Sequence, residues 1–421
     1  MKTPIMRLFV LIIFMVLQII YVHGSHFQGG MVTWKYRDNQ VYITYKVSFN
    51  NHHCDKMYIL NRILVNGEGS LMCYRGCNDT LTRTLVTSLS YYCTEFSEDD
   101  NWTYGQRTLN VTFPSTSDNI YVFGYRSGSW ATLVDGGGSW SLIATANLNI
   151  RQDIGRINSS PIAAMQPFVT VNKNCAMPYA LRIPVQDEDS DVVRCRWANN
   201  SITDECGGVC YILRNSVLDQ SNCILYINAI PLTGRYAVAL QIEDFGKQQD
   251  KIALSSIPLQ FTINVIDGTS MCDKKPRIET PLIEIPSNTM YHLTIIARST
   301  GSQISDVYIV SPVGFIKSEL LRYSSSNDSW YVNVTWTPTD EDIGIHIFCY
   351  TAIGVDRQAS DQECKTLKIV DAEGCVSNPC SNGASCTQQI NGYICKCDVG
   401  FTGIFCETDI GKLHQNVYNR Q

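Results

Sequence analysis

Polar and apolar residues alternate along much of the chain after residue 25. The alternation is clearest in five segments that are rich in Val, Ile, Thr, Tyr and Trp, namely MVTWKY, VYITYKVSF, RTLNVTF, IYVFGY and SWSLIATANL. A period of two residues places successive side chains on opposite faces of a strand, and these residue types favour strands. Turn-forming segments such as DGGG at 135–138 separate the runs. The pattern predicts a first all-β domain over residues 25–157.

The same alternation continues in two further segments, 158–270 and 271–371. They end on similar apolar strands, NVID at 264–267 and KIVD at 368–371. Short strands at this spacing are typical of β-sandwiches with about seven strands each. In this pattern both segments resemble cadherin-like or immunoglobulin-like sandwiches. The predicted fold class is mainly β: tandem disulfide-bonded β-sandwich-like domains followed by one small C-terminal module.

The first 24 residues have the features of a secretory signal peptide. Lys2 and Arg7 precede an apolar run over residues 8–22, which is short for a membrane span of roughly 20 residues. This order predicts cleavage before Ser25, with an uncleaved anchor as the alternative. Later segments are too polar to cross a bilayer, and the tail 408–421 is polar. We therefore expect no membrane span and a protein secreted to the extracellular space or matrix.

Secretion changes how charge and cysteine content are interpreted. Removal of Lys2 and Arg7 would leave 31 basic against 39 acidic residues, a net charge of −8. Because no block of Lys or Arg occurs, nucleic acid is not an expected partner. All 18 cysteines follow the signal peptide, and in an oxidising compartment they are expected to form disulfides. The candidate N-glycosylation sites are Asn78, Asn101, Asn110, Asn158, Asn199, Asn327 and Asn333.

The cysteines divide unevenly among the predicted domains. The first domain holds four, at 54, 73, 77 and 93, which is an even set. Five lie between Cys175 and Cys223, and three more are Cys272, Cys349 and Cys364. Since both of these sets are odd, either a disulfide crosses the boundary between the second and third domains or Cys272 belongs to the second.

Six cysteines near the end of the chain have the spacing C-x4-C-x5-C-x8-C-x-C-x8-C, from Cys375 to Cys406. In this spacing, and in Gly400-Phe401-Thr402-Gly403 before the last cysteine, residues 372–407 resemble an EGF-like module. So small a segment cannot bury a sufficient core, and disulfides replace it. Six cysteines allow 15 pairings, and a zinc site, the competing interpretation, does not suit a secreted chain. The resemblance implies the pairs Cys375–Cys386, Cys380–Cys395 and Cys397–Cys406 on two small hairpins.

The EGF-like resemblance also bears on modification and subtype. Ser377, Ser385 and Thr402 resemble O-glycosylation sites of such modules, although small residues in these turns can also serve folding alone. Calcium-binding EGF-like modules have a pattern that Gly374 and Gln388 do not match. Growth factors of this class carry an Arg before the last cysteine, whereas this chain has Phe405. The resemblance therefore does not extend to a growth factor.

A run of acidic residues, QDEDSD at 186–191, is the other candidate for chemistry. Asp187, Asp189 and Asp191 alternate and could direct three carboxylates toward one hard cation such as Ca²⁺, with Glu243 and Asp244 contributing from another strand. The alternative is a solvated turn between two strands. The loop lacks the Gly and the distal Glu of an EF-hand, which excludes that motif. Apart from this possible calcium, we expect no cofactor.

Catalytic motifs are missing from the sequence. It contains no G-x-S-x-G, H-E-x-x-H or phosphate-binding glycine loop. His52 and His53 adjoin Cys54, which we expect to be disulfide-bonded, and neighbouring residues of a strand face opposite ways. We therefore assign no catalytic residue and expect that the protein is not an enzyme.

Two functional hypotheses follow. The first is a secreted, glycosylated structural or adhesion protein of an extracellular matrix, which interacts through the EGF-like module and the surfaces of the β-domains. Its expected partners are matrix proteins or polysaccharide. The second is a soluble receptor ligand or signalling modulator acting through the EGF-like module. The order of signal peptide, β-rich domains and EGF-like module is similar to that of EGF-like proteins of molluscan shell matrix, which favours the first hypothesis.

Overall fold

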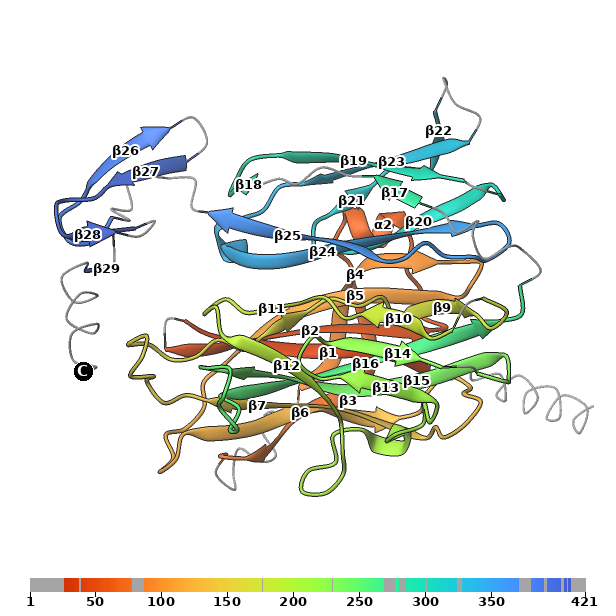
Figure 1. The fold of residues 1–421 in the computed structure, drawn as a ribbon, viewed down its shortest axis with the longest axis horizontal. Helices are drawn as coiled ribbons and strands as arrows, with labels where there is room; N and C mark the ends of the chain where they lie inside the picture. The colour runs from red at the N-terminus through yellow and green to blue at the C-terminus, as the bar shows by residue number, and fades with distance from the viewer. Residues whose placement is uncertain are drawn as a thin grey trace, which may run out of the picture.

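The computed structural model describes residues 26–37, 39–77, 87–175, 177–228, 230–268, 277–279, 285–299, 301–323, 328–370, 380–389, 392–402, 405–406 and 408–409. Several expected features lie outside these residues: the signal peptide 1–24, the tail from 410 onward, Asn78, Asn327, Cys272, Cys375 with its expected bond to Cys386, and Ser377. The fold is mostly β, as the alternation predicts (Figure 1).

An eleven-stranded sheet dominates the structure. Its order is β1-β2-β5-β4-β3-β6-β7-β16-β15-β12, and β9 also pairs with β16. The strands are β1 (His26–Arg37), β2 (Gln40–Asn50), β3 (Leu64–Arg75), β4 (Thr87–Ser97), β5 (Trp102–Val111), β6 (Ile120–Gly128), β7 (Ser139–Asn147), β9 (Phe168–Asn172), β12 (Val192–Trp197), β15 (Gly234–Phe245) and β16 (Ser255–Ile266). Strands of the sequence segments 25–157 and 158–270 therefore share one sheet, and we call residues 26–268 the first body.

Strand β16 holds this sheet together. It pairs with β15 from Ser255 to Val265. Further pairings join it to β7 at Ser256, to β1 at Leu259 and Gln260, and to β9 from Thr262 to Ile266. Because β1 and β7 both pair with β16, the two ends of the seven-strand run from β1 to β7 meet on one strand. Its residues from Ser255 to Ile263 are buried. A single hydrophobic cluster extends from Phe27 to Val265 through this body.

Shorter elements connect and flank the large sheet. Strands β10 (Tyr179–Arg182), β14 (Ile224–Ile227) and β13 (Ser216–Asp219) form a small sheet, and β8 (Ile162–Ala163) pairs with β11 (Val185–Gln186). Among the described residues the helical turns are α2 (Lys56–Leu60), η1 (Gly207–Val209) and η3 (Asp340–Asp342). Asp55 caps α2 by accepting a hydrogen bond from the backbone N–H of Tyr58. The helices within the described ranges are too short to cross a membrane.

Residues 285–370, with β17, form a two-sheet sandwich that we call the third unit. One sheet contains β17 (Arg277–Glu279), β19 (Tyr291–Arg298), β23 (Ser329–Trp336), β21 (Ile316–Lys317) and β22 (Leu321–Arg322). The other contains β18 (Ile285–Pro286), β25 (Glu363–Val370), β24 (Gly344–Gly354) and β20 (Ile304–Val310). It has a separate hydrophobic cluster, in which Phe315 stacks between Trp336 and Phe348.

The third unit packs against the first body through apolar and ionic contacts. Trp102 and Tyr104 of β5 belong to one buried cluster with Val310 and Ile347 of the third unit. Beside it, the Glu95 carboxylate, 3 % exposed, accepts hydrogen bonds from Lys317 Nζ at 2.9 Å and from the Ile309 backbone N–H at 3.0 Å. These contacts fix the two parts against one another.

The C-terminal module consists of two small antiparallel pairs, β26 (Ser385–Gln389) with β27 (Gly392–Lys396) and β28 (Phe401–Thr402) with β29 (Thr408–Asp409). In Figure 1 it lies beside the third unit, beyond the end of β25. Its bonds Cys380–Cys395 and Cys397–Cys406 are those that the EGF-like resemblance implies. Elsewhere the disulfides are Cys54–Cys93, Cys73–Cys77, Cys195–Cys223, Cys206–Cys210 and Cys349–Cys364. Cys175 and Cys386 are also disulfide-bonded.

Candidate functional site

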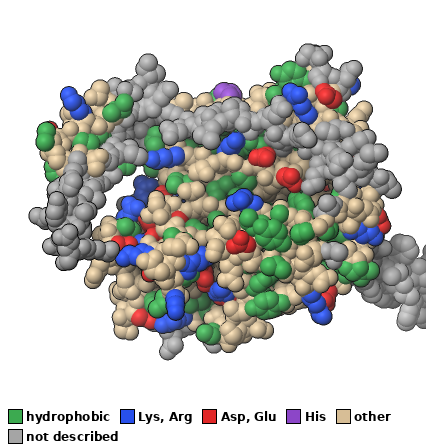
Figure 2. Space-filling view, in the orientation of Figure 1, with side chains coloured by type: hydrophobic (Ala, Val, Ile, Leu, Met, Phe, Trp, Pro, Cys, Tyr) green, Lys and Arg blue, Asp and Glu red, His purple; other side chains and the backbone are tan. Residues whose placement is uncertain are grey.

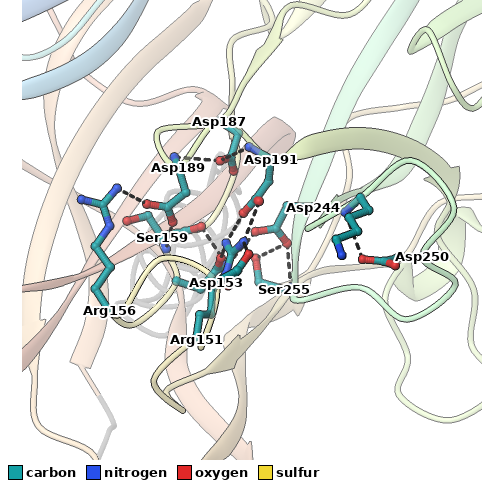
Figure 3. A network of polar contacts seen from close by, with 12 residues as sticks. Arg151, Asp153, Arg156, Ser159, Asp187, Asp189, Asp191, Asp244, Asp250 and Ser255 are labelled. Carbon is teal, nitrogen blue, oxygen red and sulfur yellow. Dashed lines mark hydrogen bonds and ion pairs between the residues drawn. The ribbon is translucent and has the colours of Figure 1, made fainter. Parts of the chain in front are cut away.

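The acidic loop joins β11 to β12 and is shaped by its first aspartate. Asp187 Oδ1 accepts hydrogen bonds from the backbone N–H groups of Asp189 at 2.8 Å and of Asp191 at 3.0 Å. Aspartate commonly stabilises a tight turn in this way, because its short side chain reaches the backbone two residues ahead. The turn brings one carboxylate oxygen of each of the three aspartates within 4.8 Å of the others (Figure 3).

Two arginines from the segment after β7 meet this loop. The guanidinium group of Arg151, which is almost fully buried, contacts both carboxylate oxygens of Asp191 and donates to Asp153 Oδ2 at 2.7 Å. Arg156 Nη2 lies 2.7 Å from Asp189 Oδ1. The planar fork of arginine suits a carboxylate, so these contacts fix the loop against the 151–156 segment of the same body.

A fourth carboxylate, that of Asp244 on β15, lies at the base of the network. Its Oδ1 accepts from the Ser255 backbone N–H at 2.7 Å and from Ser255 Oγ at 2.8 Å, and its Oδ2 accepts from Asn158 Nδ2 at 2.6 Å. Burial raises the pKa of Asp244 to about 7, and the nearby charge of Asp187 acts in the same direction, while the hydrogen bonds from Asn158 and Ser255 oppose it.

Asp187 is the second buried acid of this network that has no cationic partner among the described residues. Burial raises the pKa of the Asp187 carboxyl to about 6, although the N–H groups of Asp191 and Asp189 partly offset this rise. Its Oδ2 is buried and has no hydrogen-bond partner among the described residues. The donor set consists of hard oxygens, which suits Ca²⁺ more than a soft metal.

The sequence identified part of this network. Asp244 joins the loop, whereas the neighbouring Glu243 faces the other way and accepts from Arg196 Nε at 2.8 Å. The sequence did not predict that Arg151, Asp153 and Asn158 would belong to this network. The charged run RQDIGR at 151–156, after a predicted strand, indicates a segment that can form ion pairs. The sequence pattern does not specify which distant loop such a segment contacts.

The candidate glycosylation sites differ in exposure. Asn110 and Asn333 are exposed and Asn199 is half-buried, while Asn101 is exposed and donates to Asn51 Oδ1. Asn158 is 1 % exposed, and its Nδ2 donates to Asp244 and to the Ser159 carbonyl. A glycan on that atom would replace one of its two hydrogens and would need space that the buried side chain lacks, so the folded geometry argues against Asn158. In the EGF-like module, Ser385 and Thr402 are exposed.

The two histidines noted in the sequence differ in burial: His52 is packed, whereas the His53 side chain is 69 % exposed. His52 Nδ1 lies 2.8 Å from the Tyr91 hydroxyl, and the ring packs on Phe49. His53 Nε2 lies 3.3 Å from Asp55 Oδ2. Cys54 is bonded to Cys93.

A groove of about 1230 Å³ separates part of the first body from the third unit. Its floor is the outer face of β1 and β2, with polar residues such as Thr33, Tyr42 and Lys46, and η3 and His346 contribute the opposite wall. Burial lowers the pKa of Lys46 to about 8. The acidic loop reaches this groove, where Glu188 forms an ion pair of 2.7 Å with Lys35.

Family models match two parts of the chain. Residues 28–149 match the N-terminal region of integrin beta-like protein A-E, and residues 375–405 match the EGF-like domain. The first match covers β1 to β7, and the second covers the cysteine-rich module. The EGF-like domain and the disulfides are consistent with secretion.

Curated EGF-containing relatives match short segments of this chain. Fibropellin-3 of Strongylocentrotus purpuratus is 58 % identical over 40 residues, which are 10 % of this chain and 7 % of that protein. A Rattus norvegicus protein with sushi, von Willebrand factor type A, EGF and pentraxin domains is 53 % identical over 36 residues, which are 9 % of this chain and 1 % of that protein. The chain thus spans less than a tenth of the length of these relatives.

Similarity to solved structures is low. The SrpA adhesin of Streptococcus sanguinis is 14 % identical, covers 34 % of this chain and 98 % of its own, and gives a TM-score of 0.19. The tandem Ig repeats of Dlar are 12 % identical, cover 50 % of this chain and 98 % of their own, and give a TM-score of 0.20. Scores of this size support no conclusion about function. The sequence matches and the disulfide framework agree that this chain is a mainly β, EGF-like domain-containing protein.

Proposed function

We propose that the protein is a secreted, glycosylated, non-catalytic structural or adhesion component of an extracellular matrix, and more specifically of a shell-type matrix. The observation that carries this proposal is the combination of an EGF-like module with a disulfide-bonded β-body whose first strands match an integrin beta-like family. Modules of this kind supply rigid binding surfaces rather than convergent reactive groups. The expected partners are matrix proteins or polysaccharide.

The surface of the EGF-like module supports an interaction role. Val399 is fully exposed and Ile394 is 53 % exposed, so both apolar side chains face solvent in the isolated chain. Apolar side chains at such positions are candidates for burial against a partner. The face of the molecule seen in Figure 2 carries basic and acidic side chains interspersed over its described surface, which suits contact with mixed-charge matrix components rather than a polyanion.

The histidine pair bears on the non-catalytic part of the proposal. His52 is engaged by the Tyr91 hydroxyl and His53 by Asp55, and the adjoining Cys54 is in a disulfide. Each of these contacts engages one ring nitrogen, and the His53 side chain is 69 % exposed. The non-catalytic proposal therefore rests on the absence of catalytic motifs from the sequence.

Fractionation of the source tissue tests the proposal. Peptides of the protein would be measured by mass spectrometry in the freely secreted, detergent-extracted and insoluble or demineralised fractions. Recovery chiefly from the insoluble matrix is the expected result, and enrichment on demineralisation would support the shell-type form. Recovery chiefly from the soluble fraction would overturn the matrix role and favour the receptor-ligand hypothesis.

A binding assay tests the role of the module. The full chain and its Val399→Ser and Ile394→Ser variants would be incubated with the insoluble matrix fraction, with Ile252→Ser as the control because Ile252 is 85 % exposed on the first body. We expect the two module variants to bind less and the control to bind like the wild type. Equal binding by all four proteins would exclude this surface.

A further inference from the structure

We infer that the acidic loop binds one Ca²⁺ ion, ligated by carboxylate oxygens of Asp187, Asp189 and Asp191. The inference is independent of the proposed matrix role. It depends on three observations: the spacing of the three carboxylates, a buried oxygen of Asp187 that lacks a partner, and the excess of negative charge around it.

The spacing fits a single ion. Ca²⁺ binds oxygens at about 2.3–2.6 Å, so two ligands on opposite sides of the ion lie roughly 5 Å apart and all others lie closer together. One oxygen from each of Asp187, Asp189 and Asp191 lies within 4.8 Å of the other two. The separations of the three atoms are therefore compatible with one coordination sphere.

The buried oxygen of Asp187 points to a missing ligand. Asp187 is 4 % exposed, and its Oδ1 is satisfied by two backbone N–H groups while Oδ2 has no partner among the described residues. Buried polar atoms in folded proteins are almost always paired, because an unpaired one loses its hydration without compensation. A proton on Oδ2 would itself need an acceptor, whereas a cation would satisfy the oxygen directly.

Charge around the loop favours a cation over a neutral ligand. Five carboxylates, those of Asp153, Asp187, Asp189, Asp191 and Asp244, surround two guanidinium groups, those of Arg151 and Arg156. Buried carboxylates without a counter-charge are costly. Within the described ranges, Asp187 and Asp244 have no cationic partner. A divalent ion would neutralise the negative charge that the two arginines do not balance.

The arginine contacts are compatible with the ion. Asp189 Oδ1 accepts from Arg156, and both oxygens of Asp191 accept from Arg151. A carboxylate has about four lone-pair sites, so an oxygen can contact a guanidinium group and a metal at once. The ion would then connect the β11–β12 loop more firmly to the arginine segment, close to the groove wall formed by Glu188.

Calcium titration of the full chain tests the inference. The secreted protein would be depleted of metal and titrated with CaCl2 by calorimetry, with Tb³⁺ luminescence as a second readout and MgCl2 as the selectivity control. We expect one site that depends on the acidic loop, a Kd on the order of 10⁻⁴–10⁻³ M as in other extracellular modules, and a higher Tm with Ca²⁺ than with EDTA.

Matched variants locate the site. Asp187→Asn should weaken Ca²⁺ binding about tenfold or more, since it removes a charged ligand while keeping a hydrogen-bond acceptor for the turn. Asp219→Asn is the control: Asp219 also accepts from two backbone N–H groups in a turn, those of Ser221 and Asn222, but lies outside the acidic network. It should bind Ca²⁺ like the wild type.

Two results would overturn the inference. One is a wild-type protein without Ca²⁺ binding heat, Tb³⁺ luminescence or a Tm difference between Ca²⁺ and EDTA. The other is a wild-type affinity retained by Asp187→Asn, which would place any bound calcium elsewhere, for example in the EGF-like module. If circular dichroism shows that Asp187→Asn does not fold, Asp189→Asn takes its place. A wild-type affinity retained by Asp189→Asn would then overturn the inference in the same way.

Discussion

His52 illustrates at the scale of one residue how burial couples stability to pH. The ring packs against Phe49 and Tyr91, and burial lowers the pKa of His52 to about 4. In the unfolded chain a histidine titrates near 6.5, so below that pH the unfolded state binds the proton more readily than the folded one. The stability that the neutral ring confers is complete above about pH 6.5 and is lost progressively as the pH falls toward 4.

Substitution of His52 should reveal this dependence. His52→Gln keeps a group that can hydrogen-bond to the Tyr91 hydroxyl but cannot become charged. We expect the Tm of the variant to fall less between pH 7.5 and 4.5 than the Tm of the wild type. The Tm difference between the two proteins at pH 7.5 is the baseline, because His52 is neutral there in both the folded and the unfolded state. Parallel Tm profiles would show that His52 does not titrate with folding.

The acidic network shows what residue patterns could and could not predict. The alternation of Asp187, Asp189 and Asp191 was sufficient to select the loop, because its spacing is local. Arg151 is 40 residues from its partner Asp191, and nothing in either segment specifies that pairing. The burial of Asn158 could not be predicted either, because the sequon pattern is the same whether its asparagine is exposed or buried.

At the scale of elements, the strands were predictable and their neighbours were not. The segment MVTWKY lies in β1 and IYVFGY in β6, because a two-residue period with aromatic and β-branched residues specifies a strand directly. The pairing of β16 with β1, β7 and β9 joins residues far apart in sequence. Such pairings depend on packing in the whole body, which a local pattern does not encode.

The central position of β16 predicts a large effect for truncation of its core side chain. Phe261 is fully buried and pairs across the sheet with Val238. Phe261→Ala should lower the free energy of unfolding by about 3–5 kcal/mol, because it removes apolar contacts and leaves a cavity. Thermal and urea unfolding measure the loss.

Ile252 offers a control for this substitution, since it is 85 % exposed in the turn before the same strand. Ile252→Ala should change the free energy of unfolding by less than about 0.5 kcal/mol. A small effect of Phe261→Ala, similar to that of the control, would mean that β16 does not hold the two groups of strands together.

At the scale of the whole molecule, the contact between the first body and the third unit decides whether the chain acts as one rigid object. Three ion pairs between described residues cross this contact, and two of them differ sharply in burial. Glu95 and Lys317 are 3 % and 16 % exposed at the side chain, whereas Lys56 and Glu319 are 53 % and 80 % exposed. A buried pair is costly to break, while an exposed pair contributes little.

We therefore expect Lys317→Met to be far more disruptive than Lys56→Met. The first leaves the Glu95 carboxylate buried without its cation and should cost about 3–5 kcal/mol, while the second should cost less than about 1 kcal/mol. Thermal unfolding and limited proteolysis of the junction report the change. The double variant Glu95→Gln/Lys317→Met should recover part of the loss, and equal effects of the two single variants would contradict the assigned role of the buried pair.

The closure of the large sheet on β16 has a consequence for biosynthesis. After β7 ends at Asn147, about 110 further residues must be made before β16 begins at Ser255. At translation rates of about 5–20 residues per second, this takes roughly 5–20 s. During that interval the edges of β1 and β7 that later pair with β16 lack that partner, and unpaired strand edges promote aggregation. The nascent chain is therefore expected to depend on chaperones until residue 266 emerges from the ribosome.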